Sequence, residues 1–311
     1  MTDFLITHKT EYLYEEPASL SYNEARMIPR SFSHCLFEQR CLERQISIEP
    51  FWTDYRERLD FFGNEVLYFT LRRPHRQTII TATSRVRLLP RPERESTFTN
   101  GNTWMNSPAY RTPWETVRHT LRHDLAADIL EARQYVMNSA VVTVFPALVS
   151  YAAPSFPPDR PILEAVRDLM SRIHRDFAFV PGVTTVATPL AEVLEARKGV
   201  CQDFAHLMLG CLRAQRLAAR YVSGYIETIP PPGQEKLEGA DASHAWVSVF
   251  MPGAGWLDFD PTNNLIPHDQ HLTVAWGRDF SDVTPLKGVF FSTGDHKLQV
   301  SVDVKRLAEI D

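Results

Sequence analysis

The chain has 311 residues, and its 33 lysine and arginine residues against 38 aspartate and glutamate residues give a formal net charge of −5. This length suggests about two domains. A hydrophobic content of 44% with 23% charged residues is typical of a folded globular protein. A small disulfide-stapled scaffold is excluded, because so long a chain holds only four cysteines. The slightly acidic balance gives no electrostatic reason to bind nucleic acid, and we expect no such partner.

The first residues lack the basic segment and apolar stretch that are typical of a signal peptide. No run of residues approaches the roughly 18 apolar residues that span a bilayer. We therefore expect a cytoplasmic protein without a membrane partner, in which thiols stay reduced. Cys35, Cys41 and Cys211 are expected to be structural.

The first ninety residues predict β-structure. Residues 4–14 and 65–72 are rich in β-branched and aromatic residues, and residues 78–89 alternate with period two. Proline, glycine and asparagine separate these runs, which is typical of a β-sandwich. Residues 90–106, with two early prolines, are predicted to be a linker.

The next part of the chain predicts helices. Residues 114–151 carry apolar residues at three- and four-residue spacing, among them Leu125 and Leu130. A further helix is predicted from about Pro161, since proline is tolerated in the first turn of a helix. Its apolar face would be formed by Ile162, Val166, Leu169, Met170 and Ile173.

One cysteine differs from the others in its position. Residues 188–212 predict a helix from about Pro189 that stops near Gly199, and an apolar helix that begins at about Cys201. The helix dipole and free backbone N–H groups favour a thiolate at a helix N-terminus, and the thiolate is the nucleophile. The same N–H groups could stabilise an oxyanion. Cys201 is therefore the candidate nucleophile, whereas Cys211 lies inside the same helix.

A thiolate nucleophile needs a base and a residue that orients the base. His244 opens a predicted strand, and a turn with proline and glycine connects it to a second strand that ends at Asp260. The start of one hairpin strand faces the end of the other, so we expect His244 near Asp260. Asp258 shares the strand face of Asp260, and the pattern alone does not choose between them. Asp260 is better placed, at the strand end before Pro261.

Three segments resemble the signature blocks of the bacterial transglutaminase-like superfamily. Residues 199–206 read GVCQDFAH, residues 243–246 read SHAW, and residues 256–262 read WLDFDPT. Residues 220–226 and 277–285 resemble further blocks of the same core. The β-rich start is similar to the N-terminal domain that often precedes this core, so the resemblance covers most of the chain.

The resemblance implies an α+β fold, with an N-terminal β-sandwich-like domain over residues 1–95. A papain-like catalytic core with a helical lead-in and C-terminal strands would follow over residues 96–311. The resemblance also implies that Cys201 attacks an amide carbonyl, that His244 acts as base and then acid, and that Asp260 orients the imidazole. Water would resolve the thioester in a hydrolase, and an amine would resolve it in a transglutaminase.

Four further residues are candidates for substrate binding or support of the site. Many relatives carry tyrosine near the position of Phe179, so the oxyanion here could rely more on backbone N–H groups. Gln202 and Asp203 follow the nucleophile, and Asp203 could tune the thiolate or serve only as a partner of the helix dipole. Trp246 could keep water from the site, or be a core residue.

Other polar residues carry less weight. His206 is expected to be structural, and residues 227–241 are either a lid or specificity loop or a plain connector. His268, His271 and His296 lack a compact metal-ligand spacing. No glycine-rich phosphate loop is present in the sequence. We therefore expect neither a metal nor another cofactor.

The leading hypothesis is a transglutaminase-like cysteine hydrolase that cleaves a peptide, isopeptide or other amide bond in a peptide or protein substrate. Acyl transfer from a protein glutamine to an amine is the alternative reaction. A non-catalytic peptide-binding module is the alternative class, and the intact set of Cys, His and Asp disfavours it.

Overall fold

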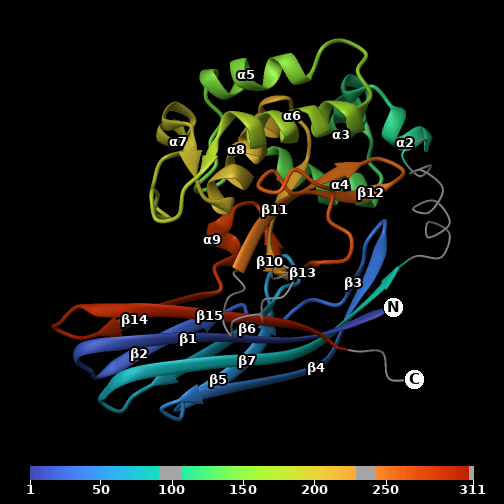
Figure 1. Cartoon of the computed structure of the whole chain (residues 1–311). Helices are drawn as coiled ribbons and strands as arrows, with labels where there is room; N and C mark the ends of the chain where they lie inside the picture. The colour runs from blue at the N-terminus through green and yellow to red at the C-terminus, as the bar shows by residue number, and fades with distance from the viewer. Residues whose placement is uncertain (91–104, 106, 229–242, 308–311) are drawn as a thin grey trace, which may run out of the picture.

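The computed structural model describes residues 1–90, 105, 107–228 and 243–307. Figure 1 shows a lower part built of long strands, an upper part built of helices, and a sheet of β10, β11 and β13 between them. Helices and strands occur together in one α+β architecture, which confirms the expected fold class. Within the described ranges, no helix has both the length and the apolar character needed to cross a bilayer.

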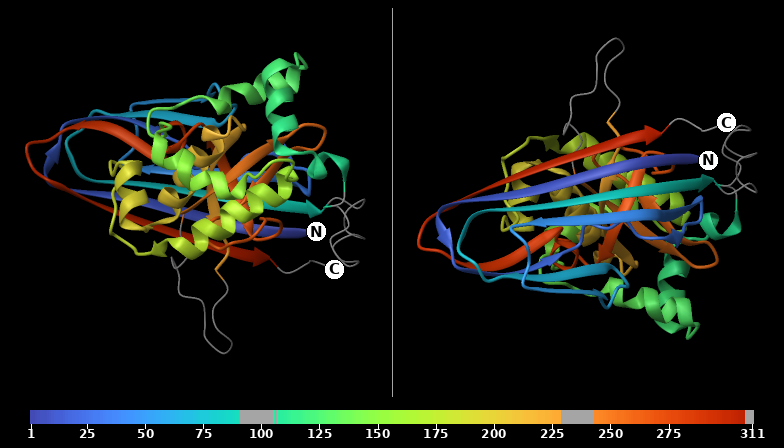
Figure 2. Two further views of the ribbon diagram at one scale, coloured as in Figure 1. Left: turned by 90° about the horizontal axis from the view of Figure 1, so that it is seen from above. Right: turned by 90° about the horizontal axis from the view of Figure 1, so that it is seen from below.

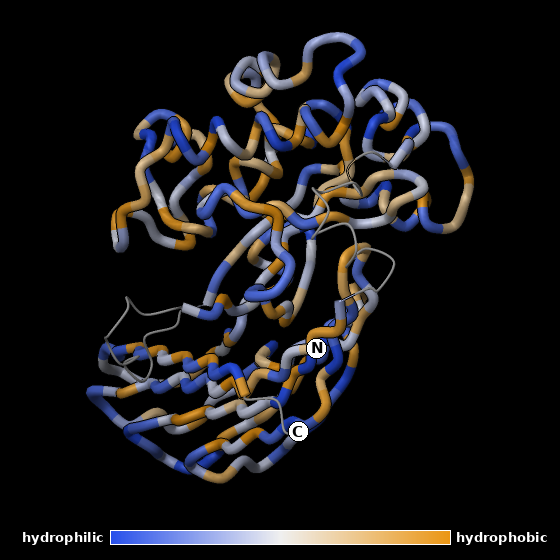
Figure 3. Tube along the Cα trace, turned by 45° about the vertical axis from the view of Figure 1, so that its right-hand side comes forward, coloured by the Kyte–Doolittle hydropathy of each residue, from blue (hydrophilic) through white to orange (hydrophobic). Residues whose placement is uncertain are grey.

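The lower part contains two antiparallel sheets, with strand orders β15-β1-β7-β4-β3 and β14-β2-β6-β5. Figure 3 shows hydrophobic and hydrophilic residues alternating along these strands, as expected when one face of a sheet is buried. The strands expected over residues 4–14, 65–72 and 78–89 are confirmed. The strand bounds are β1 (Thr2–Ala18), β2 (Leu20–Ala25), β3 (Phe32–Ser33), β4 (Phe37–Glu49), β5 (Asp54–Leu59), β6 (Glu65–Leu71), β7 (His75–Pro90), β14 (Leu286–Phe291) and β15 (His296–Leu307).

These two sheets share a hydrophobic core. Apolar side chains from β2, β4, β6 and β7 pack together between them, as in a sandwich. The buried members of this core are Ala25, Met27, Ile28, Ile48, Leu67, Phe69, Leu71, Ile80 and Ala82.

The chain returns to these sheets near its C-terminal end. β14 pairs with β2, and β15 pairs with β1 from Asp3 opposite Leu307 to Tyr14 opposite His296. Figure 2 shows β15 beside β1 in both views. Strands from the segment 96–311 therefore complete sheets that the segment 1–95 begins. The domain division at residue 95 stays a prediction.

The upper part is built on a third antiparallel sheet, with strand order β12-β11-β10-β13. Helix α8 packs against β10 and β11 and is covered by α5, α6 and α7. The remaining strands are β8 (Ala178–Phe179), β9 (Lys198–Gly199), β10 (Ala219–Ile226), β11 (Ser243–Met251), β12 (Gly255–Phe259) and β13 (His271–Gly277). The helices are α2 (Pro108–Arg111), α3 (Trp114–His123), α4 (Ala127–Arg133), η2 (Gln134–Val136), α5 (Pro146–Ala152), η3 (Ala153–Ser155), α6 (Ile162–Asp176), α7 (Leu190–Ala196), α8 (Cys201–Ala214) and α9 (Phe280–Val283).

The helical expectations are met in part. In α6 every residue of the expected apolar face is buried. Residues 114–151 instead form separate short helices, because the Asp124 side chain accepts a hydrogen bond from the backbone of Ala126 and turns the chain between α3 and α4. Leu125 at this turn is 74% exposed and Leu130 is 46% exposed, so neither is the core residue that its spacing predicts.

Two amide side chains of the lower part hold β13, an edge strand of the third sheet. Gln39 donates to the carbonyl of Thr273 at 2.7 Å and accepts from its N–H at 2.9 Å. Asn64 donates to the carbonyl of Trp276 at 2.9 Å and accepts from its N–H at 3.0 Å. Both amides are buried. The N-terminal sheets thus position the strand that carries His271.

Candidate active site

The thiol of Cys201 lies at the start of α8, as the sequence predicts. Asp203, in the first turn, accepts hydrogen bonds from the backbone of Val200 at 2.8 Å and from the hydroxyl of Thr184 at 2.6 Å. These bonds stabilise the helix N-terminus and tie it to the preceding loop. Asp203 therefore holds the segment that presents the half-buried Cys201 thiol.

The preceding helix stops near Gly199, as the sequence predicts, but Gly199 is not its cap. Helix α7 ends at Ala196, and Arg197 takes the left-handed conformation with φ 54°. Gly199 belongs to β9, which pairs with β8. A Cβ at Gly199 would lie 2.7 Å from the carboxylate of Asp203. Glycine is required there because Asp203 approaches so closely.

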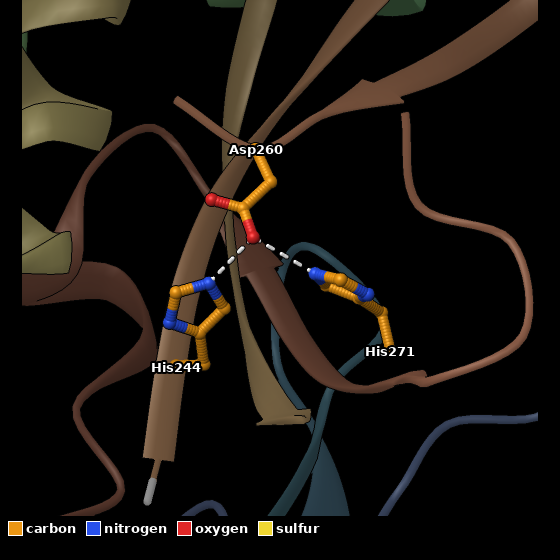
Figure 4. A group of neighbouring side chains, drawn as sticks. All are labelled: His244, Asp260 and His271. Carbon is orange, nitrogen blue, oxygen red and sulfur yellow. Dashed lines mark hydrogen bonds and ion pairs between the residues drawn. The ribbon is translucent and has the colours of Figure 1, made fainter. Parts of the chain in front are cut away.

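His244 and Asp260 meet as the sequence predicts. The ring nitrogen Nε2 of His244 donates to Oδ2 of Asp260 at 2.8 Å, as Figure 4 shows. The hairpin of β11 and β12 brings them together, and Gly253 and Gly255 in its turn take φ values of 81° and 82°. His244 is 8% exposed and Asp260 is fully buried, so this contact is shielded from water.

The carboxylate of Asp260 accepts five hydrogen bonds. Its Oδ2 atom also accepts from Nε2 of His271 at 2.9 Å and from Nδ2 of Asn263 at 2.7 Å. Its Oδ1 atom accepts from the backbone N–H groups of Thr262 and Asn263. Burial raises the pKa of Asp260, but hydrogen bonds from His244 and His271 and their charges bring it well below its usual range. Asp260 is therefore an anion that does not take up the proton of His244.

The charge state of His244 follows from these contacts. Burial lowers the pKa of His244, but hydrogen bonds to Asp260 and to Cys201, and the charges of both groups, raise it to about 10. Nε2 faces Asp260, so the other side of the ring remains for the thiol. The environment thus favours an imidazolium between a carboxylate and a sulfur atom.

The sequence reasoning missed two residues of this site. His271 lies on β13, on the opposite side of Asp260 from His244 (Figure 4), and burial lowers the pKa of His271 although Asp260 opposes the shift. The sequence around His271, at the start of a strand, gave no indication of this role. Asn263 could have been found, because an aspartate side chain often accepts backbone N–H groups two or three residues ahead in a turn.

The structure separates the two candidate aspartates. Oδ2 of Asp258 accepts from the indole N–H of Trp246 at 3.0 Å, and Oδ1 lies 3.5 Å from Nε2 of His34. Asp258 therefore supports Trp246 and does not contact His244. Trp246 is fully buried, and its ring centroid lies 6.1 Å from that of His244. Trp246 is therefore a core residue that also borders the site.

Phe179 and Gln202 lie close to Cys201 in the fold. Phe179 pairs with Gly199 across β8 and β9, is 52% exposed, and its ring centroid lies 6.4 Å from that of Phe204 in α8. Gln202 is half-buried in the first turn of α8. His206 is buried and accepts from the backbone of Phe280 at 3.1 Å, in agreement with the structural role expected for it. Most of the expected lid or specificity loop, residues 227–241, lies outside the described residues.

His244, Asp260 and His271 are also a donor set that a metal ion could use, since their ligand atoms lie within 4.8 Å of one another. Two imidazoles and a carboxylate suit zinc. In this structure both Nε2 atoms instead donate to one oxygen of Asp260. These hydrogen bonds account for the arrangement, and the expectation of no metal stays a prediction.

Comparison with known proteins identifies the family. Residues 4–87 match the model of the bacterial transglutaminase-like N-terminal region, and residues 151–261 match that of the transglutaminase-like superfamily. An uncharacterized protein of Mycobacterium tuberculosis is 40% identical over 306 residues, which are 97% of this chain and 92% of that protein. An uncharacterized protein of Mycobacterium leprae is 32% identical over 307 residues, which are 97% of this chain and 98% of that protein. The chain belongs to the bacterial transglutaminase-like superfamily.

Two further similarities concern one part of the sequence and the overall fold, respectively. A "protein-glutamine gamma-glutamyltransferase" of Pseudomonas aeruginosa is 37% identical over 111 residues, which are 34% of this chain and 17% of that protein. A solved structure from Cytophaga hutchinsonii, described as a "putative cysteine protease", matches with a TM-score of 0.72 and 19% identity, covering 100% of this chain and 92% of that one. That likeness confirms the fold over the whole chain.

Proposed function

We propose that this protein is a cysteine hydrolase that cleaves an amide bond in a peptide or protein through a thioester on Cys201. The observation that carries the proposal is the contact of 2.8 Å between His244 and the anionic Asp260, with Cys201 at a helix start on the other side of the imidazole. Nucleophile, base and orienting group are the three parts that acyl transfer by a thiol requires.

The first half of the reaction forms the acyl-enzyme. The sulfur of Cys201, as the thiolate paired with the His244 imidazolium, attacks the carbonyl carbon of the substrate. The N–H groups of Cys201 and Gln202 stabilise the oxyanion, because the first N–H groups of a helix have no partner within it. His244 then gives its proton to the leaving amine, the C–N bond breaks, and a thioester remains on Cys201.

The second half releases the product. A water molecule attacks the thioester carbonyl while His244, now neutral, accepts its proton. The C–S bond breaks, the acid is released, and Cys201 and His244 return to the thiolate–imidazolium pair. Asp260 keeps the ring oriented throughout and stays ionised. Phe179 would contact the substrate on its way to the thiol.

Acyl transfer to an amine is the second candidate reaction. The similarity of 111 residues to a glutamine gamma-glutamyltransferase favours it, and only the attacking group differs. We place hydrolysis first because water is the default acceptor, and we keep the cytoplasm as the proposed location.

The test exposes peptides from a cell extract to the protein, with and without an added primary amine, and identifies products by mass spectrometry. Hydrolysis predicts new acids whether or not the amine is present, and transfer predicts amine adducts. The Cys201→Ala variant should form neither product, and Cys211→Ala, which removes a fully buried thiol of the same helix, should retain activity. Equal product formation by wild type and Cys201→Ala would refute the proposal.

A chelator and a trapping reagent complete the test. Activity should persist with a chelator present, as a thiol mechanism needs no ion. Hydroxylamine should convert a thioester intermediate to a hydroxamate and regenerate the thiol. Loss of activity with the chelator, and recovery with added zinc, would point instead to metal chemistry at His244, Asp260 and His271.

A further inference from the structure

A cavity of about 410 Å³ lies where the N-terminal sheets meet the third sheet and helix α4. None of Cys201, His244 and Asp260 lines this cavity. Its wall contains the side chains of Cys35, Arg220, Trp256 and Trp276, and Asp128 and Glu131 of α4 lie at its edge.

Arg220 is the unusual residue of this cavity. It is 5% exposed, and its guanidinium lies 4.2 Å from the ring centroid of Trp256 and 3.8 Å from that of Trp276. Within the part of the chain that the structure describes, its buried Nε has no acceptor, and no carboxylate reaches ion-pair distance. Burial lowers the pKa of Arg220 to about 10, which leaves it charged at neutral pH. The charges of Asp258 and Glu131 act against this lowering, but neither carboxylate accepts a hydrogen bond from Nε. A buried cation with an unsatisfied donor is costly, so the site suits an anion from outside.

Two carboxylates oppose this cation. Asp128 and Glu131 lie one turn apart on α4, and both are exposed. They line the same cavity as Arg220, and among the described residues neither forms an ion pair with it, although the charge of Glu131 raises the pKa of Arg220. A simple anion would be repelled by them. A molecule with a carboxylate at one end and an ammonium group at the other would satisfy both sides.

We propose that this cavity binds a free α-amino acid with an apolar or aromatic side chain. Its carboxylate pairs with Arg220, its ammonium group pairs with Asp128 and Glu131, and its side chain packs against the apolar lining formed by Phe32, Phe250 and Ala254. The proposal is independent of the reaction at Cys201, because it concerns a separate cavity.

Cys35 provides a reporter inside the cavity. Its sulfur lies 3.7 Å from Nδ1 of His34, whose Nε2 faces Asp258 at 3.5 Å. Burial raises the pKa of the Cys35 thiol, but the charge of His34 and a hydrogen bond with it bring the value below the ordinary one. A small neutral reagent such as iodoacetamide should therefore label it. Half-buried Cys41 does not line the cavity and serves as the internal control.

The experiment follows iodoacetamide labelling of each cysteine in the full-length Cys201→Ala variant, by peptide mass spectrometry. We expect L-phenylalanine to slow labelling of Cys35 by about tenfold and to leave Cys41 unchanged. N-acetyl-L-phenylalanine lacks the ammonium group and L-phenylalaninamide lacks the carboxylate. Each should need about tenfold more compound for the same protection, since each loses one charged hydrogen bond. Equal protection by all three compounds, protection of both cysteines, or no protection of Cys35 would overturn the proposal.

Two double variants test the edge of the cavity without altering a buried residue. Asp128→Asn with Glu131→Gln should raise the half-protecting concentration of L-phenylalanine about tenfold. Glu192→Gln with Glu195→Gln removes two exposed carboxylates of α7, outside the cavity lining, and should change nothing. Equal effects of the two pairs would show a general charge effect and overturn the proposal.

Discussion

Gly224 pairs with His244 across β10 and β11, and no side chain fits at its position. A Cβ there would lie 2.2 Å from the backbone oxygen of Leu272 and 2.5 Å from the ring of Trp246. Both neighbours belong to the surroundings of the candidate site, because Leu272 follows His271 and Trp246 borders His244. The close packing of three strands thus sets the position of the imidazole.

The first prediction is that Gly224→Ala displaces this packing. We expect a loss of about 1–3 kcal/mol in the free energy of unfolding, which is typical of overpacking. The rate of iodoacetamide labelling at Cys201 should fall as well, because His244 moves. Gly182→Ala is not a matched control, since Gly182 has φ 73°. Ser243→Ala on the neighbouring strand, at an exposed position, provides one and should leave both quantities unchanged.

The second prediction concerns Asp260→Asn. Without the carboxylate, burial dominates and the pKa of His244 falls from about 10. The imidazolium then persists only at lower pH, so the alkaline limit of activity should move to lower pH. The rate at neutral pH should drop by about 10²–10⁴-fold. Asp258→Asn removes a buried carboxylate of β12, two residues before Asp260, and should retain the alkaline limit, because Asp258 does not contact His244. Identical profiles for the two variants would contradict the assignment of Asp260.

The same contact predicts a pH dependence of stability. The pKa of His244 is raised in the folded protein from an ordinary value of 6.5 to about 10. Its contribution to stability is therefore fully present below pH 6.5 and is lost as the pH rises through 10. Urea unfolding across this range should show a decline in the wild type that is smaller in Asp260→Asn. A parallel decline in both proteins would argue against the pair.

The fourth prediction concerns Gln39, which holds β13. Gln39→Glu replaces the donor that serves the carbonyls of Arg30 and Thr273, so two acceptors then face a carboxylate. We expect a loss of about 1–3 kcal/mol in the free energy of unfolding. Gln45→Glu makes the same change at an exposed position of β4 and should cost far less. If the strand also positions His271, Gln39→Glu should lower activity in the protein that remains folded.

The fifth prediction concerns acid stability. Burial lowers the pKa of His206 to about 4 in the folded protein, from an ordinary 6.5. Its neutral form stabilises the fold above pH 6.5, and this contribution is lost as the pH falls through 4. His206→Gln can still accept from the backbone of Phe280 but does not titrate. Its unfolding free energy should therefore fall less steeply in acid than that of the wild type, whereas exposed His119→Gln should match the wild type.

The parts of the site that depend on neighbouring segments could be predicted from the sequence. The start of α8 follows from the local pattern of apolar residues. The pairing of His244 with Asp260 follows from the short turn that connects the two strands of the hairpin. His271 could not be predicted in this way. It reaches Asp260 because β13 joins the sheet beside β10, a relationship set by the order of strands and not by spacing along the chain.

The cavity at Arg220 and the environment of Cys35 could not be predicted from the sequence, for the same reason. Cys35 lies in the turn between β3 and β4, Arg220 lies on β10 of another sheet, and only the packing of these sheets brings them to one cavity. The structural role expected for Cys211 agrees with the structure, where burial raises the pKa of its thiol to about 12. The position of Cys35 beside His34 marks it as chemically different from Cys211.

The pairing of β15 with β1 has a consequence for biosynthesis. A growing chain emerges from the ribosome N-terminus first, so β1 is made long before residues 296–307 exist. Until then one long edge of the five-stranded sheet is open, and an open edge can pair with another nascent chain. The sheet below the candidate site is thus completed only after β15 has been made, and a chain truncated before β15 would be released with its aggregation-prone edge exposed.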